Sequence, residues 1–111
     1  MAVDLHVHST VSDGSMTPEE IVRKAHEIGL SAVALADHDA IAGIAPAQAA
    51  APDGLQVFPA LEISAETDAS EIHILGYFFD CANVPLNKTL SRVRESRVER
   101  ARVITDKLNK I

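Results

Sequence analysis

Residues 2–39 contain the sequence "AVDLHVHSTVSDGSMTPEEIVRKAHEIGLSAVALADHD", which predicts a strand, a helix and a second strand in that order. Apolar and polar residues alternate over residues 2–8, the period of a strand with one buried face. The second strand, residues 31–39, begins as an apolar run on both faces, and such strands are typical of parallel sheets covered by helices. This stretch therefore predicts an α/β fold.

The helix between these strands has clear start and stop signals. Thr17 is a natural N-cap, Pro18 fits the first helical position, and Glu20 completes a capping box. Gly29 ends the apolar stripe of the helix. The first strand should accordingly bury one face, formed by Val3, Leu5 and Val7. Its other face, formed by Asp4, His6 and His8, should point toward solvent or a ligand.

Four further elements follow in the sequence. We expect a short or bent helix at residues 40–51, capped by Asp39 and limited by Pro46. Two strands at 55–64 and 71–80 are joined by a polar stretch at 66–70, and a long amphipathic helix covers 86–110. The order of elements favours a largely parallel sheet.

The composition limits the class of protein. The chain has 111 residues, of which 47% are hydrophobic, enough for one core. Its single cysteine, Cys81, excludes an intramolecular disulfide and a cysteine-based zinc site. No segment resembles a signal peptide or approaches the ~20 apolar residues that span a bilayer. We expect a soluble, cytoplasmic protein without membrane contacts.

Charge is distributed unevenly along the chain. Residues 1–87 have only Arg23 and Lys24 as bases against thirteen acidic residues, a net charge of −11. Residues 88–111 have eight bases against three acidic residues, a net charge of +5. Two interpretations are open: a solvated basic helix beside an acidic body, or an acidic half suited to cations with a basic half suited to phosphates.

Histidines and carboxylates occur where the predicted strands end, which is where α/β folds bind ligands. One buried histidine is usually an ordinary core residue, but the same exception in four segments favours a shared site. A buried Glu62 without a cation or partner would be costly. The candidate residues are His6, His8, Asp13, Asp37, His38, Asp39, Glu62 and His73.

Imidazoles and carboxylates together are suitable ligands for Zn, Mn and Fe. Residues two apart in a strand point the same way, so His6 and His8 can hold one ion together. The loop and a flexible Gly14 allow Asp13 to reach a second ion. Mixed ligation of several ions is typical of hydrolytic sites.

Four motifs resemble one known family. They are "DLHVHSTVSDG" (4–14), "ALADHD" (34–39), "PALEIS" (59–64) and "EIHILGYFFD" (71–80). With them residues 1–80 resemble the N-terminal part of the PHP (polymerase and histidinol phosphatase) metal-dependent phosphoesterases. The resemblance is greatest to the stand-alone branch of nucleotide phosphatases and small 5′-to-3′ exoribonucleases.

The resemblance implies the N-terminal part of a distorted seven-stranded β/α barrel, with two or three divalent ions (Mn, Zn or Fe) at the strand ends. His6, His8 and Glu62 would hold one ion, and Asp13 and His38 a second. Glu62 would bridge to a third ion that also binds His73. In the family, further ligands come from later strands that lie beyond Ile111.

The length of the chain bears on its domain organisation. A complete barrel of this kind needs ~200 residues or more. We therefore expect residues 1–85 to be the N-terminal part of the barrel and 86–111 to begin a helical insertion of a longer enzyme. An open sheet edge predicts self-association or docking with the missing C-terminal half.

The function implied is hydrolysis of nucleotide or short oligonucleotide phosphate esters by a metal-activated water. His38 and His73 are candidates to protonate the leaving oxygen. Asp37 is a candidate to orient a metal-binding imidazole without contacting the ion. Arg97 is a candidate to bind a substrate phosphate. Ser9 and Ser12 are expected to make turn hydrogen bonds. The isolated 111-residue chain is expected to be weakly active or inactive, because the late ligands are missing. The alternatives are a histidinol-phosphate phosphatase-like enzyme and a metal-binding but inactive structural or interaction module.

Overall fold

The computed structural model describes residues 2–66 and 68–110. Met1, Thr67 and Ile111 belong to predicted segments but lie outside the described residues. The chain divides into two compact units, Met1–Asp80 and Cys81–Ile111, which are described separately.

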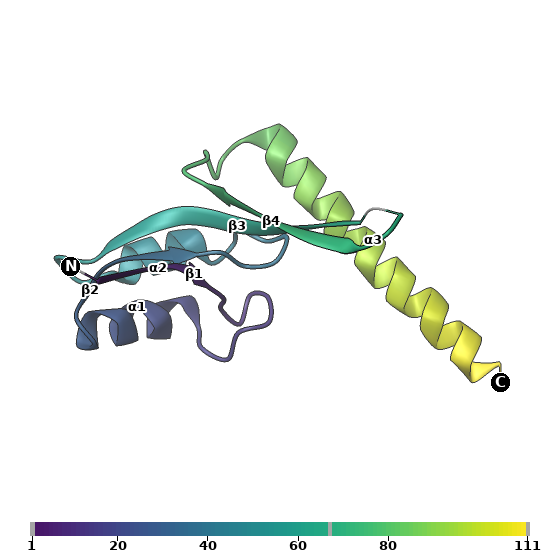
Figure 1. Cartoon of the computed structure of the whole chain (residues 1–111), viewed down its shortest axis with the longest axis horizontal. Helices are drawn as coiled ribbons and strands as arrows, with labels where there is room; N and C mark the ends of the chain where they lie inside the picture. The colour runs from purple at the N-terminus through teal and green to yellow at the C-terminus, as the bar shows by residue number, and fades with distance from the viewer. Residues whose placement is uncertain (1, 67, 111) are drawn as a thin grey trace. The chain divides into compact units, whose positions relative to one another are not determined.

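The first unit is a four-stranded sheet with two helices (Figure 1). Neighbouring strands in the sheet follow the chain order, β1-β2-β3-β4. The β1–β2 and β2–β3 pairings are parallel, and the β3–β4 pairing is antiparallel. The elements are β1 (Ala2–Val7), α1 (Pro18–Glu27), β2 (Leu30–Leu35), α2 (Ile44–Ala50), β3 (Gln56–Glu66) and β4 (Glu71–Tyr77). The predicted α/β fold with a mostly parallel sheet is confirmed, and the seven-stranded barrel stays a prediction.

Helix α1 begins as its sequence predicts. The Thr17 side chain accepts a hydrogen bond from the Glu20 amide at 3.1 Å, and the Glu20 carboxylate accepts from the Thr17 amide at 3.4 Å. Pro18 occupies the first turn, where no amide hydrogen is needed. The capping box fixes where the helix starts, and so where the loop that follows β1 must end.

The two faces of the sheet are covered differently. Helices α1 and α2 pack on one face, where the core contains Ile21, Val22, Ala25, Val33, Leu35, Ala47 and Leu55. The opposite face has small residues, Ala34, Ala36 and Ala60, with Phe58 and Tyr77 packed against them. The prediction of helices on both faces therefore holds for one face of the described unit.

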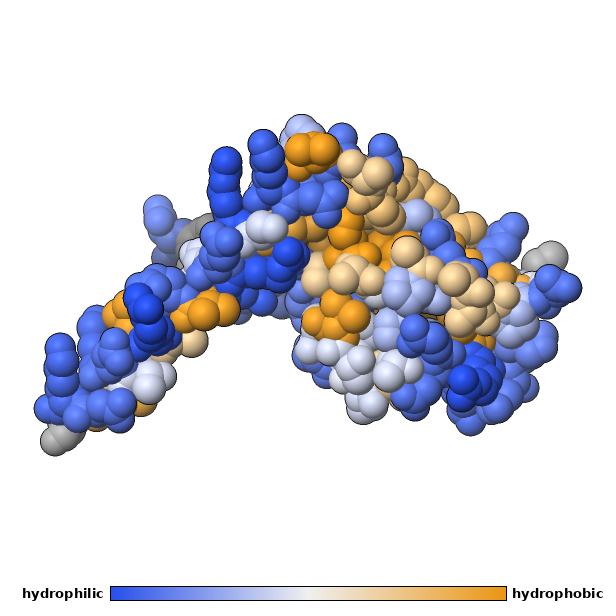
Figure 2. Space-filling view, turned by 180° about the vertical axis from the view of Figure 1, so that it is seen from behind, coloured by the Kyte–Doolittle hydropathy of each residue, from blue (hydrophilic) through white to orange (hydrophobic). Residues whose placement is uncertain are grey.

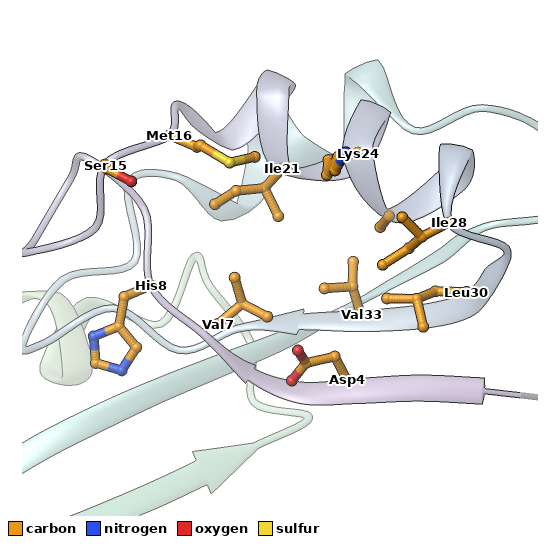
Figure 3. Close-up of a pocket in the computed structure, with 11 residues that line it drawn as sticks. Asp4, Val7, His8, Ser15, Met16, Ile21, Lys24, Ile28, Leu30 and Val33 are labelled. Atoms are coloured by element: carbon orange, nitrogen blue, oxygen red, sulfur yellow. The ribbon is translucent and has the colours of Figure 1, made fainter.

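Figure 3 shows the apolar groove between α1 and β1, with His8 at the end of the groove nearest the loop that follows β1.

Strand β1 departs from the predicted buried face. Val3 and Leu5 are 51% and 43% exposed, although Val7 packs against the core. Strand β1 lies at the edge of the sheet, and its register with β2 shifts between Asp4 and Val7. Alternation in the sequence predicts which side chains share a face, but the position of a strand within the sheet decides whether that face is covered.

Helix α2 begins later than predicted, and Asp39 does not cap it. The N-cap of α2 is Gly43, which makes no side-chain cap hydrogen bond. Asp39 has a φ of 52° and is buried, and its Oδ1 accepts a hydrogen bond from the Ser64 amide at 3.2 Å. The helix is seven residues long, so the prediction of a short helix holds, but Pro46 lies in its first turn, where proline is tolerated, and does not limit its length.

The second unit contains α3 (Val84–Asn109). It begins two residues before the predicted start because Pro85 fits its first turn, and Asn83 caps it by accepting from the Leu86 amide at 2.8 Å. Hydrophilic residues cover most of the visible surface of α3 in Figure 2. No helix among residues 2–66 and 68–110 has the length and apolar character needed to cross a bilayer.

Candidate metal centre

Glu62, on β3, stands at the centre of the candidate site. The residue is only 5% exposed, yet four imidazoles surround its carboxylate. His6 Nε2 lies 2.7 Å from Oε1, and His38 Nδ1 lies 3.0 Å from Oε2. His73 Nδ1 is 3.3 Å and His8 Nε2 is 3.8 Å from Oε2. Four separate segments of the chain thus meet at one buried carboxylate.

Asp13 is a second carboxylate at the rim of the same site. Its Oδ1 lies 2.7 Å from His8 Nδ1, and its Oδ2 lies 3.1 Å from His38 Nε2. Unlike Glu62, the Asp13 side chain is 62% exposed, because it projects from the loop between β1 and α1. His8 and His38 each present one ring nitrogen to Asp13 and the other to Glu62.

The donor atoms fall into three groups in which all ligand atoms lie within 4.8 Å of one another. The groups share residues and use all six predicted ligands: His6, His8 and Glu62; His8, Asp13 and His38; His38, Glu62 and His73. His8 and His38 each belong to two of these groups, which was not predicted. Because a neutral imidazole has only one nitrogen with a free lone pair, each of these histidines would bind one ion and not two.

His73 reaches this site from the start of its strand. Antiparallel β4 pairs His73 with Ser64, near the end of β3. The beginning of β4 therefore lies beside the carboxyl ends of the parallel strands. The sequence placed His73 inside a strand of a largely parallel sheet, and the antiparallel direction of β4 was not predicted.

Both carboxylates are held in the anionic form. Burial alone raises the pKa of Glu62, but hydrogen bonds from His73 and His6 and the charges of His38 and His6 lower the pKa below its ordinary value. The pKa of Asp13 is lowered chiefly by its hydrogen bond with His8. Anionic carboxylates accept and never donate, so they suit a cation.

One observation tests whether a cation fits. His38 Nδ1 is buried and has no hydrogen-bond partner among the described residues, even though Glu62 Oε2 lies 3.0 Å away. The contact is close enough for a hydrogen bond, but its geometry is not that of one. A cation that shares the lone pairs of both atoms would satisfy them. The residues therefore fit a divalent ion.

The predicted role of Asp37 needs correction. Its buried carboxylate makes its described hydrogen bonds to Ser9 and Ser12, not to an imidazole. The expectation that Ser9 and Ser12 make turn hydrogen bonds is confirmed. The burial of Ser9 was not predicted, although its position directly after the strand was an available signal.

Gly14 is required for a reason other than flexibility. A Cβ built on Gly14 would lie 2.1 Å from the His8 carbonyl oxygen and 2.9 Å from the Ser9 carbonyl carbon. The Gly14 amide also donates to the Ser9 carbonyl at 2.8 Å. The loop closes so tightly on the end of β1 that only glycine fits, and this closure brings Asp13 to His8.

Arg97 lies on α3, in the second unit, and is exposed. Its predicted contact with a substrate phosphate remains a prediction.

Comparison with known proteins agrees with this geometry. A family model described as "PHP domain" matches residues 4–105. The chain is 42% identical over 108 residues to a 5′-3′ exoribonuclease of Haemophilus influenzae. The match covers 96% of this chain and 39% of that protein. It is 40% identical over 101 residues to a 3′,5′-nucleoside bisphosphate phosphatase of Chromobacterium violaceum, covering 90% of this chain and 35% of that protein.

Solved structures include a similar fold. An amidohydrolase from Chromobacterium violaceum, crystallised with sulfate and no metal, superposes with a TM-score of 0.84 at 40% identity. The match covers 90% of this chain and 36% of that one. The chain thus spans less than two fifths of the length of these relatives.

Proposed function

The chain belongs to the PHP domain family, and from this premise we propose that it contributes the N-terminal part of a metal-dependent phosphoesterase acting on nucleotide or short oligonucleotide phosphate esters. The observation that carries the proposal is the buried Glu62 carboxylate with four imidazoles within 4 Å of it. The names of the exoribonuclease and bisphosphate phosphatase relatives support this substrate class.

The six candidate ligands would hold two or three divalent ions. His6, His8 and Glu62 would bind one, Asp13 and His38 a second, and Glu62 with His73 a third. Manganese, zinc and iron all suit this donor set. Bound ions would polarise a phosphoryl oxygen and lower the pKa of a water molecule.

The residues of the chain would direct the reaction by position. Glu62 and Asp13 keep the imidazoles oriented through the short contacts described above. Both ring nitrogens of His38 and of His73 lie within 4 Å of a carboxylate, but the His73 side chain, on the edge strand β4, is 44% exposed and that of His38 is 19% exposed. His73 is therefore better placed to exchange a proton with solvent and deliver it to a leaving oxygen. Arg97 would bind a phosphate of the substrate.

Partners and domain organisation are part of the same proposal. We assign residues 1–85 to the barrel and 86–111 to the start of a helical insertion. Strand β1 has a partner strand on one side only within the described residues, and Val3 and Leu5 are exposed along it. A second copy of the chain, or the C-terminal half of the enzyme, would pair with this edge. The location proposed is the cytoplasm.

Hydrolysis assays test the proposal. The chain is incubated with Mn²⁺ and, separately, with a 3′,5′-nucleoside bisphosphate, a short 5′-phosphorylated RNA and histidinol phosphate. Release of phosphate or mononucleotide from the first two at a low rate, absent in Glu62→Gln, is the expected result. Preference for histidinol phosphate would favour the alternative phosphatase. Mn²⁺ binding without any hydrolysis would support an inactive metal-binding module.

A further inference from the structure

Asp37 is a buried carboxylate that the proposed chemistry does not use. It is 2% exposed and accepts three hydrogen bonds. Oδ1 accepts from the Ser9 amide at 2.6 Å and from the Ser12 hydroxyl at 2.8 Å, and Oδ2 accepts from the Ser9 hydroxyl at 2.7 Å. A buried anion is stable only with such donors, so the carboxylate and the loop hold each other in place.

We propose that Asp37 is a positioning residue that sets the separation of Asp13 from His38, and thereby the geometry of the cation position that these two residues form. This inference rests on the proposed function. Asp37 contacts neither an ion nor a substrate in this role. It acts through Ser9 and Ser12, the two serines of the loop between His8 and Asp13.

The loop side of this connection is a short chain of contacts. The Ser12 and Gly14 amides both donate to the Ser9 carbonyl, at 3.1 Å and 2.8 Å, and the Val11 amide donates to the Ser9 hydroxyl at 3.1 Å. The Ser12 hydroxyl lies 3.4 Å from Asp13 Oδ1. Ser9 thus organises the turn, and Asp37 fixes Ser9. The Asp13 side chain is 62% exposed, so packing alone does little to hold it there.

The sheet side of the connection is fixed by the backbone. The Asp37 carbonyl accepts from the Glu62 amide at 3.1 Å, and the Asp39 amide donates to the Glu62 carbonyl at 2.9 Å. His38, between these two residues, is thereby locked beside Glu62. The Asp37 side chain, whose backbone is fixed in this way, then holds the loop through its hydrogen bonds to Ser9 and Ser12. One residue joins the rigid part of the site to the exposed part.

The substitution Asp37→Asn tests the proposal, because asparagine has nearly the same shape but loses one acceptor oxygen. Its Oδ1 can retain two donors, whereas its NH₂ group meets the Ser9 hydroxyl as a second donor. Ser12→Ala removes one of the three hydrogen bonds and should act in the same direction with a smaller effect. Asp53→Asn, an exposed aspartate, controls for the loss of one charge.

The first measurement is Mn²⁺ binding by calorimetry without substrate. For Asp37→Asn we expect one class of ions to bind about 10–100-fold more weakly, the range seen when residues behind a ligand are changed. The remaining class should keep its wild-type affinity. The proposal would be overturned if Asp37→Asn weakened Mn²⁺ binding equally at every class of site, or if it weakened binding at no site.

The second measurement needs no metal. Hydrogen exchange of the Ser12 and Gly14 amides should accelerate in Asp37→Asn, while exchange of the Asp39 and Glu62 amides keeps its wild-type rate. Acceleration throughout the sheet would show a merely structural role, and unchanged exchange would show that Asp37 does not hold the loop. If wild-type protein binds no Mn²⁺, the proposed function fails, and the exchange pattern alone decides whether Asp37 positions Asp13.

Discussion

The centre and the rim of the candidate site are held in different ways. Asp37, Asp39 and Glu62 are at most 5% exposed and lie on segments joined by backbone hydrogen bonds. The side chains of His6, Asp13 and His73 are 47%, 62% and 44% exposed, on edge strands and a loop. The centre therefore has a position set by the sheet, whereas the rim takes its position from contacts with the centre.

Loss of Glu62 should have the largest effect, because it removes the centre that four histidines contact. We expect Glu62→Ala to bind less metal than any of the other five single ligand-to-alanine variants. Elemental analysis after dialysis against Mn²⁺ measures this. His26→Ala, an exposed histidine on α1, is the matched control and should keep wild-type content. An unchanged metal stoichiometry in Glu62→Ala would show that the centre and rim do not differ in this way.

Gly14→Ala disturbs the support of the rim without replacing a ligand side chain. The added methyl group would lie 2.1 Å from the His8 carbonyl oxygen, so the loop must move and take Asp13 with it. We expect a loss of about 1–3 kcal/mol in the free energy of unfolding, as for other overpacked positions. Urea unfolding with Gly76→Ala as the control measures this, since a Cβ at Gly76 meets nothing within 4 Å. Equal stability of the two variants would contradict the close packing of the loop.

Acid should weaken the metal-free chain through the two carboxylates. The pKa values of Glu62 and Asp13 are lowered in the folded protein, so the stability they contribute is complete above their ordinary pKa of about 4. It is lost as the pH falls through their lower folded values. We expect the free energy of unfolding of wild type to fall more steeply below pH ~4 than that of Glu62→Gln. If denaturant titrations give the same pH dependence of the free energy of unfolding for wild type and Glu62→Gln, the contacts of Glu62 with its histidines do not stabilise the fold.

The smallest expected effect is on the association of chains through their opposite charges. The acidic charge of residues 1–87 and the basic charge of residues 88–111 should favour association of chains at low ionic strength, and salt should weaken it. Size-exclusion chromatography at low and high salt measures this, with Lys107→Glu/Lys110→Glu as the variant that reduces the basic charge. Identical elution of both proteins at both salt concentrations would count against charge-driven association.

The donor atoms of the site and most elements of the fold were predictable from the sequence. The capping box at Thr17, the alternation in residues 2–8 and the apolar run before Asp37 are local patterns that depend on neighbouring residues. The two-residue spacing of His6 and His8 likewise places both side chains at the same site. Local patterns are readable because backbone geometry repeats over a few residues.

The tertiary structure decided the features that depend on long-range pairing. Antiparallel pairing of β4 determines how His73 reaches Glu62, and the edge position of β1 leaves Val3 and Leu5 exposed. The partners of Asp37 and Asp39 lie 28 and 25 residues away in the sequence. The close contact that excludes a side chain at Gly14 arises only when the loop folds back on β1. Hydrogen bonds of buried carboxylates and steric exclusion depend on distances between segments, and those distances exist only once the sheet has assembled.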